Sequence, residues 1–121
     1  MSNNSQKLVG RITPQIAMIA GNVSDGDPIY IGTGNIEHIK TKHPREYQLY
    51  FSYLEDILNN PDYININTHD GSIRYLKVLA ENVVVGVRVS ANGVAFARTL
   101  YLFNQSRFDK YLKNGDLIPV K

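Results

Sequence analysis

The apolar residues of this chain change their spacing about halfway along its 121 residues. Between about Arg45 and Asn59 they recur at steps of three and four, which predicts one amphipathic helix that ends before Pro61. The residues with this spacing are Tyr47, Tyr50, Phe51, Leu54, Ile57 and Leu58. From Asp62 onward, apolar residues alternate with polar ones, as they do in strands whose two faces differ.

This alternating part predicts four strands in succession, at about 63–66, 73–79, 83–90 and 94–101. Asp70-Gly71 precedes the second strand and Asn92-Gly93 follows the third, and such pairs favour tight turns because their residues tolerate positive φ. We therefore expect an antiparallel meander. A last amphipathic helix should run from about Gln105 to Asn114, where Gly115 ends it.

Two more helices are predicted ahead of the meander. Thr13-Pro14 is typical of an N-cap followed by proline at the first helical position, and this helix should end at Gly21. A short strand at 29–31 separates it from the second helix, which has Thr33 or Asn35 as its N-cap.

Together these elements predict one α+β domain. Its N-terminal helices pack on the apolar face of a roughly four-stranded antiparallel meander, and a C-terminal helix closes the fold. A chain of 121 residues can bury a single core, so no second domain is implied. We expect the polar residues 1–7 to form a flexible lead and residues 8–121 to form the domain.

Composition narrows the classes of function. The chain has no cysteine, which excludes disulfides, thiolate metal sites and a cysteine nucleophile, and its three histidines lack the spacing of a helical zinc pair. We expect neither a metal nor a cofactor. The first residues lack the pattern of a signal peptide and no segment resembles a membrane span, so we expect a cytoplasmic protein without a membrane partner. A net charge of +2 and a pI near 8.9 favour modest attraction to nucleic acid.

The segment from His38 to Pro44 holds two histidines, two lysines and a threonine near one predicted helix end. Histidine can transfer a proton near neutral pH and lysine can hold a phosphate, so these residues suit phosphodiester chemistry. Taken alone, the segment also fits a solvated helix end. His38 and His43 are roughly 140° apart on an ideal helix and can face one pocket only if the helix ends near Lys42 or His43, as Pro44 suggests. Otherwise His43 is only a structural cap.

The order of these features resembles the phage-associated members of the ribonuclease superfamily that includes barnase, EndoU, RelE and the colicin tRNases. The matching features are a helix with His38, then His43-Pro44, a helix ending in Leu58-Asn59-Asn60-Pro61-Asp62, a strand with Lys77, a valine-rich strand and Arg98-Thr99-Leu100-Tyr101. The resemblance covers about Val9 to Lys113. It implies the fold shared by this superfamily and a small metal-independent ribonuclease, often a toxin or effector of a mobile element. It also implies that His38, Lys77 and Thr99 line the open sheet face, with Tyr101 nearby.

Successive side chains of a strand point to opposite faces of the sheet, which predicts the face on which each of these residues lies. Lys77 and Arg74 should point to opposite faces of their strand, and the resemblance selects Lys77 for the site. Thr99 and Tyr101 should share a face with the small alanines of the last strand, which would leave space for a ligand. Arg98 should then lie on the face opposite Thr99.

The leading hypothesis is an endoribonuclease that uses the 2′-hydroxyl of RNA, with tRNA as one candidate substrate, and leaves a cyclic phosphate. The predicted catalytic residues are His38, Lys77, Thr99, His43 and Tyr101, and the predicted RNA-binding residues are Lys42, Arg88, Arg98 and Arg74. An immunity protein or antitoxin is a second candidate partner. The alternative is a non-catalytic module that binds RNA or protein through the strand cations. The combination of His38, Lys77 and Thr99 in this order favours the enzyme.

Overall fold

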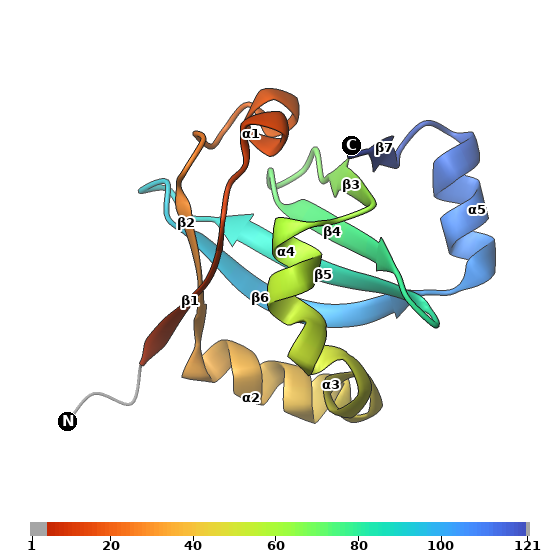
Figure 1. The fold of residues 1–121 in the computed structure, drawn as a ribbon, viewed down its shortest axis with the longest axis horizontal. Coiled ribbons are helices and arrows are strands. Elements are labelled where there is room, and N and C mark those ends of the chain that lie inside the picture. Colours follow the sequence, from red (N-terminus) through yellow and green to blue (C-terminus); the bar gives the residue numbers. More distant parts are fainter. Residues whose placement is uncertain (1–4, 121) are drawn as a thin grey trace.

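The computed structural model describes residues 5–120, whose fold is drawn in Figure 1. Strands in this part form one sheet in the order β1-β2-β6-β5-β4-β3-β7. Their bounds are β1 (Gln6–Arg11), β2 (Pro28–Gly32), β3 (Tyr63–Ile66), β4 (Ile73–Val78), β5 (Asn82–Val89), β6 (Ala95–Phe103) and β7 (Ile118–Pro119). Each strand from β3 to β6 pairs antiparallel with the next, so the predicted four-stranded meander is confirmed.

The sheet is wider than predicted because three strands join the edges of the meander. β2 pairs in parallel with β6, β1 pairs antiparallel with β2, and β7 pairs with β3. β1 and β7 were missed because β1 buries only Val9 and Gly10 and β7 has two residues, so neither shows an extended alternation. β1 begins at Gln6, within the range predicted as a lead; residues 1–4 of that range lie outside the described residues.

Helices cover one face of this sheet. They are α1 (Pro14–Ala20), α2 (Thr33–Lys42), α3 (Pro44–Tyr50), the 3-10 turn η1 (Phe51–Tyr53) and α4 (Leu54–Asn59). The last helix, α5 (Gln105–Lys113), follows the meander and lies on the opposite face. Figure 1 shows α4 crossing in front of the sheet, with α2 and α3 at its lower edge. The main core lies between these helices and the sheet, where Ile57 and Leu58 of α4 are buried with Ile73, Tyr75 and Val85.

The predicted first helix has the expected ends. The Thr13 hydroxyl accepts a hydrogen bond from the backbone N–H of Ile16, at 3.3 Å. Gly21 ends the helix with a φ of 80°, a conformation that glycine adopts without steric cost. No helix within residues 5–120 has both the length and the apolar character needed to cross a membrane.

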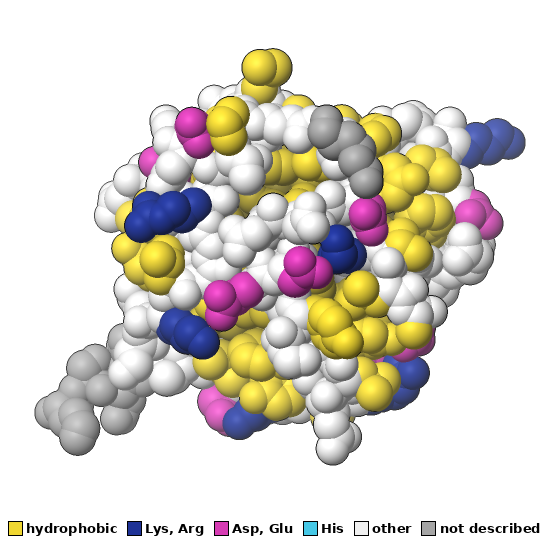
Figure 2. Space-filling view, viewed as in Figure 1, with side chains coloured by type: hydrophobic (Ala, Val, Ile, Leu, Met, Phe, Trp, Pro, Cys, Tyr) yellow, Lys and Arg dark blue, Asp and Glu magenta, His cyan; other side chains and the backbone are white. Residues whose placement is uncertain are grey.

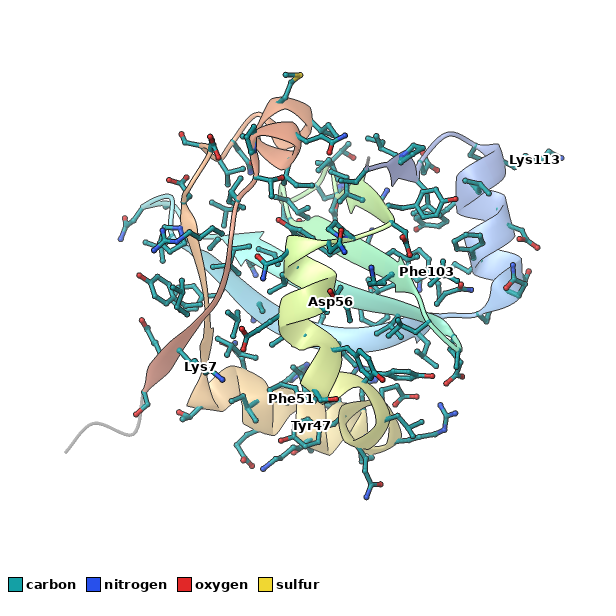
Figure 3. All side chains as sticks on the ribbon, in the orientation of Figure 1. Lys7, Tyr47, Phe51, Asp56, Phe103 and Lys113 are labelled. Carbon is teal, nitrogen blue, oxygen red and sulfur yellow. The ribbon has the colours of Figure 1, made fainter. Side chains whose placement is uncertain are left out.

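The single helix predicted from about residue 45 to residue 59 is wrong, because the chain turns at η1 and divides it into α3 and α4. The apolar side chains on both sides of the turn still belong to the main core, which buries Tyr50 together with Leu54 and Ile57. The turn also brings the Tyr50 hydroxyl to Glu81, between β4 and β5, to which it donates at 2.7 Å. Tyr47 and Phe51 pack together at the turn, with ring centroids 4.6 Å apart (Figure 3).

The opposite face of the sheet is covered only at one end. There α5 contributes Phe108 and Tyr111, which pack against a second buried cluster of Leu76, Val84, Phe103 and Leu117. Phe103 and Tyr111 meet edge to face, with centroids 5.0 Å apart. The rest of this face is left open, and we call it the open face.

Candidate active site

The open face carries a pocket with a volume of about 570 Å³, which we call the histidine pocket. Its floor is formed by outward side chains of β4, β5 and β6, and its walls by the first turns of α2 and the loop between β3 and β4. The lining residues are Gly34, Asn35, His38, Asn67, Asp70, Ser72, Arg74, Gly86, Val87, Arg88, Arg98, Thr99 and Tyr101. Most of the candidate site residues from the sequence therefore lie in one place.

Three arginines line the histidine pocket from adjacent strands. Arg74 lies on β4, Arg88 on β5 and Arg98 on β6. Arg74 donates to the side-chain oxygen of Asn65 at 2.7 Å, which holds its guanidinium beside the pocket. Within residues 5–120, none of the three forms an ion pair with a carboxylate. Their charges therefore remain available to an anionic ligand.

An irregularity in β6 decides which way its side chains point. Gly86 on β5 pairs with Thr99 and Val87 pairs with Ala97, so Arg98 is the extra residue of a β-bulge. Because of this bulge, Arg98 and Thr99 both line the histidine pocket. The predictions that Thr99 shares a face with the alanines of β6 and that Arg98 lies opposite Thr99 are both wrong. Alternation alone cannot anticipate an extra residue.

Gly86 provides the room that this arrangement needs. It lies opposite Thr99 in the sheet, and a Cβ atom added at Gly86 would lie 3.0 Å from the Thr99 methyl carbon. Such a contact is tighter than most Cβ contacts in proteins, so a larger residue at position 86 would require the Thr99 side chain to shift by a few tenths of an ångström. Because glycine has no side chain, the space beside Thr99 stays open to a ligand.

The first turns of α2 bring His38 to the pocket. The helix starts directly after β2, with Gly32 as its N-cap, and the Asn35 side chain accepts a hydrogen bond from the Gly32 N–H at 2.9 Å. Ile39 is fully buried and fixes the rotation of the helix. Asn35 and His38, three residues apart, consequently share the helix face that borders the pocket.

His43 lies close to this site without lining the pocket. It ends α2 and precedes α3, so the predicted end of the helix near Lys42 or His43 is confirmed. Its ring lies against Tyr101, with centroids 6.1 Å apart, and Tyr101 lines the histidine pocket. Lys42 is exposed in the last turn of α2 and is not among the lining residues.

Lys77 does not lie in the histidine pocket. Its ammonium group donates to the Asn60 carbonyl at 2.7 Å and lies 3.9 Å from a carboxylate oxygen of Asp56, at the end of α4. It lines a separate pocket with Pro61 and Asp62. The expectation that Lys77 joins Thr99 on the open face is therefore wrong. Arg74 occupies the open face of the same strand instead.

The loop between β3 and β4 contributes pocket residues that the sequence analysis missed. Asn67, Asp70 and Ser72 line the wall facing α2. Hydrogen bonds from Ser72 lower the pKa of Asp70, and the charges of Arg88 and Arg74 act in the same direction. Asp70 is part of the Asp-Gly pair that signalled a turn, and this signal gave no indication of a binding surface. Within residues 5–120, no group of three or more histidine or carboxylate side chains is placed to hold a metal ion.

The histidine pocket therefore combines an imidazole, that of His38, with three guanidinium groups and the hydroxyls of Ser72, Thr99 and Tyr101. Guanidinium groups bind phosphate oxygens through paired N–H donors, and an imidazole can accept or donate a proton near neutral pH. Proton transfer and phosphate binding are the functions that a phosphodiester cleavage site requires.

Comparison with known proteins identifies a family for most of the chain. A family model described as phage-Barnase-EndoU-ColicinE5/D-RelE like nuclease 3 matches residues 6–110, which extend from β1 into α5. No match was found among curated proteins or among solved structures. The matched range contains every residue that lines the histidine pocket.

Proposed function

Because the chain belongs to the phage-associated family of barnase-, EndoU-, colicin- and RelE-like nucleases, we propose that it is an endoribonuclease whose active site is the histidine pocket. The observation that carries the proposal is that His38 and three arginines line one pocket. This set supplies a proton-transfer group and a phosphate-binding surface, and it needs no metal ion to do so.

The proposed reaction uses the nucleophile that RNA itself carries. The 2′-oxygen attacks the adjacent phosphorus, its proton leaves to a base, and the bond to the 5′-oxygen of the next nucleotide breaks as that oxygen gains a proton. The products are a 2′,3′-cyclic phosphate and a 5′-hydroxyl. His38 acts as the base or the acid, and the hydroxyls of Thr99 and Tyr101 are the candidates for the second proton transfer.

The arginines act on the phosphate. As the 2′-oxygen attacks, negative charge builds up on the non-bridging oxygens, and fixed guanidinium groups stabilise this charge more than that of the ground state. Arg74 is held by Asn65, so its donors are oriented before the RNA binds. Arg88 and Arg98 are exposed and extend the positive surface along the open face.

The proposal includes a biological setting. The family is phage-associated, and we infer that the protein acts on host or competitor RNA, with tRNA as one candidate substrate. An immunity protein or antitoxin is a proposed partner. Acidic side chains of such an inhibitor would form ion pairs with the three arginines of the histidine pocket.

Analysis of fragment ends tests the reaction directly. Purified protein is incubated with total RNA in the presence of EDTA, and the new ends are identified chemically. We expect fragments with cyclic phosphates and 5′-hydroxyls. A synthetic RNA that carries 2′-deoxyribose at the cleaved nucleotide should resist cleavage at that site. Activity that disappears with EDTA and returns with magnesium, or cuts that persist at the 2′-deoxy site, would exclude the proposed chemistry.

A further inference from the structure

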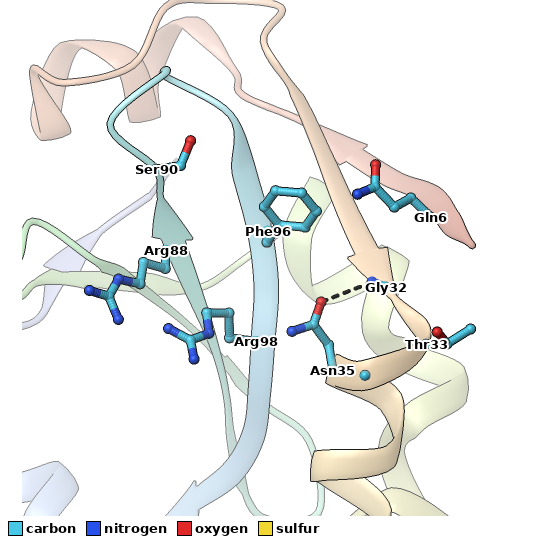
Figure 4. A pocket seen from close by; sticks show the side chains of 9 residues that line it. Gln6, Gly32, Thr33, Asn35, Arg88, Ser90, Phe96 and Arg98 are labelled. Carbon is cyan, nitrogen blue, oxygen red and sulfur yellow. Dashed lines mark hydrogen bonds between the residues drawn. The ribbon is translucent and has the colours of Figure 1, made fainter. Parts of the chain in front are cut away.

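A second pocket lies beside the histidine pocket and shares four lining residues with it. It has a volume of about 440 Å³, and the shared residues are Gly34, Asn35, Arg88 and Arg98. Its other lining residues include Phe96 and Ser90, which Figure 4 shows around the same opening. A ligand bound between Arg88 and Arg98 would therefore contact both pockets.

The register of the strands places an aromatic ring directly beside an arginine. Leu8 on β1 pairs with Tyr30 on β2, Tyr30 pairs with Phe96 on β6, and Phe96 pairs with Arg88 on β5. These four residues form one row across the sheet. Tyr30 packs beside Phe96, with ring centroids 6.2 Å apart, and limits the positions that the Phe96 ring can take.

Phe96 is partly exposed at the second pocket, although a phenylalanine is more often buried. Phe96 pairs with Arg88 across the sheet, and the Cβ atoms of directly paired residues are about 5 Å apart. The two arginines of this pocket therefore start from strand positions next to an aromatic ring. A partly exposed aromatic ring within a positively charged groove is the arrangement by which proteins stack a base of single-stranded RNA.

Hydrogen-bond donors border this ring. The Asn35 side-chain oxygen accepts from the Gly32 N–H, which fixes the orientation of the amide (Figure 4). The Asn35 NH₂ group therefore points away from Gly32, on the side of Arg98 (Figure 4). Arginine side chains can only donate hydrogen bonds, so Asn35, Arg88 and Arg98 together present donors to a bound base.

We propose that the second pocket is a base-binding subsite, in which Phe96 stacks on the base next to the cleaved phosphate and Asn35 donates to a carbonyl of that base. The proposal rests on the endoribonuclease function proposed above. The donors select a base with a carbonyl at the edge facing them, so uracil binds better than cytosine and guanine better than adenine. Cleavage is accordingly biased toward sites that place such a base in this pocket.

Binding of a non-cleavable RNA tests the subsite separately from catalysis. The probe is a short single-stranded oligonucleotide with 2′-O-methyl ribose at the nucleotide that would be cleaved, and affinity is measured by fluorescence anisotropy. Replacing the base on one side of the target phosphate with an abasic residue should weaken binding to the parental protein about 5- to 150-fold. Phe96→Leu should weaken binding of the intact probe to a similar degree and remove this dependence on the base.

The matched control is Tyr53→Leu, which replaces an aromatic side chain on η1 by leucine, as Phe96→Leu does on β6. Tyr53 is 45% exposed and lies outside both pockets. Tyr53→Leu should bind the intact and abasic probes as the parental protein does. Circular dichroism and thermal midpoints of both variants establish that they are folded; if Phe96→Leu is unfolded, Phe96→Tyr, which keeps the aromatic ring, should retain the dependence on the base.

Asn35→Asp tests the selection of the base. Aspartate keeps the oxygen that accepts from the Gly32 N–H and removes the two N–H donors. The measured quantity is the ratio of affinities for two probes that differ only in uracil or cytosine at the subsite, because this ratio cancels the effect of the added charge. The parental protein should favour uracil, and the variant should lose or reverse this preference.

Each result separates the subsite from the proposed reaction. If the parental protein ignores both the abasic residue and the change from uracil to cytosine, the subsite is absent even when RNA is cleaved. If Phe96→Leu keeps full dependence on the base, the base binds elsewhere. If no RNA is cleaved and yet the probes show the expected pattern, the endoribonuclease function fails and the base-binding pocket stands.

Discussion

Arg74 and Lys77 lie three residues apart on β4, and their surroundings show how the two faces of the sheet differ. Lys77 lies on the helix-covered face, where its ammonium group donates to the Asn60 carbonyl and lies 3.9 Å from the Asp56 carboxylate. Figure 3 shows Asp56 on α4, and Figure 2 shows the same face with basic and acidic side chains close to one another. Arg74 lies on the open face, where its partner is the neutral amide of Asn65.

The helix-covered face mainly stabilises the fold, and the open face carries the proposed binding site. On the covered face, apolar side chains pack the helices against the sheet, and Lys77 lies beside Asp56 of α4. On the open face, three arginines line one pocket without a carboxylate partner within residues 5–120. The Asp70 carboxylate lines the same pocket and is the one acidic group among its lining residues, so three positive charges face one negative charge there. This excess of positive charge favours binding of an anion.

The largest expected effect on the open face comes from His38→Ala. Loss of a positioned acid or base should slow RNA cleavage by about 10²- to 10⁴-fold. His38 is exposed, so the circular dichroism spectrum and the thermal midpoint should change little. The matched control is His69→Ala, because His69 is also exposed and does not line the histidine pocket. Equal rates for the two variants would remove His38 from the mechanism.

On the covered face, Ile57→Ala should reduce stability instead. Ile57 is fully buried in the main core, and truncation of such a residue lowers the free energy of unfolding by about 2 to 5 kcal/mol. Chemical denaturation measures this loss. At a temperature where the variant is still folded, its rate of RNA cleavage should equal that of the parental protein. A folded variant with a large loss of rate would show that the two faces are not separable.

The pair Arg88→Met and Lys77→Met compares the two faces by the same change. Methionine keeps part of the aliphatic stem and removes the charge. Arg88→Met should cost about 2 to 4 kcal/mol of transition-state stabilisation, or roughly 30- to 1,000-fold in kcat/KM. Lys77→Met should keep the parental rate and lower the free energy of unfolding by about 1 kcal/mol, since its hydrogen bond to Asn60 is lost. The reverse result would assign the phosphate contact to Lys77.

The smallest expected effect is on the pH dependence of stability, through Glu81 at the turn between β4 and β5. Hydrogen bonds from Tyr50 and from Arg45 hold the pKa of Glu81 below its ordinary value of 4.5. A carboxylate with a lowered pKa stabilises the fold above pH 4.5, and this contribution is lost as the pH falls through the lower, folded-state value. Glu81→Gln should therefore flatten the fall in thermal midpoint below pH 4.5. An unchanged slope would mean that other carboxylates control acid stability.

Much of the fold was predictable because its signals are local. The alternation in β3 to β6, the Asn92-Gly93 turn and the Thr13-Pro14 helix start each depend on residues that are neighbours in the chain. The same holds for His38, which a short helix places beside the last strand of the meander. The confirmed predictions are those for which local preference and tertiary packing agree.

The errors arise where contacts between distant residues decide the geometry. The β-bulge at Arg98 exists because β6 pairs with β5, and it turns both Arg98 and Thr99 toward the pocket. The break at η1 allows Tyr50 to reach Glu81, which is 31 residues away in the sequence. Lys77 was assigned to the site by resemblance, but α4 covers that face of β4. None of these contacts can be inferred from the spacing of residues along the chain.

Mapping where RNA binds on the two faces tests the central claim most directly. Isotope-labelled protein is titrated with a short RNA that carries 2′-O-methyl ribose throughout, which binds without being cleaved, and backbone amide resonances are followed by NMR. We expect the largest shifts at His38, Arg88 and Thr99, and little change at Asp56 and Lys77. Shifts centred on Asp56 and Lys77, with the open face unaffected, would contradict the assignment of the active site to the histidine pocket.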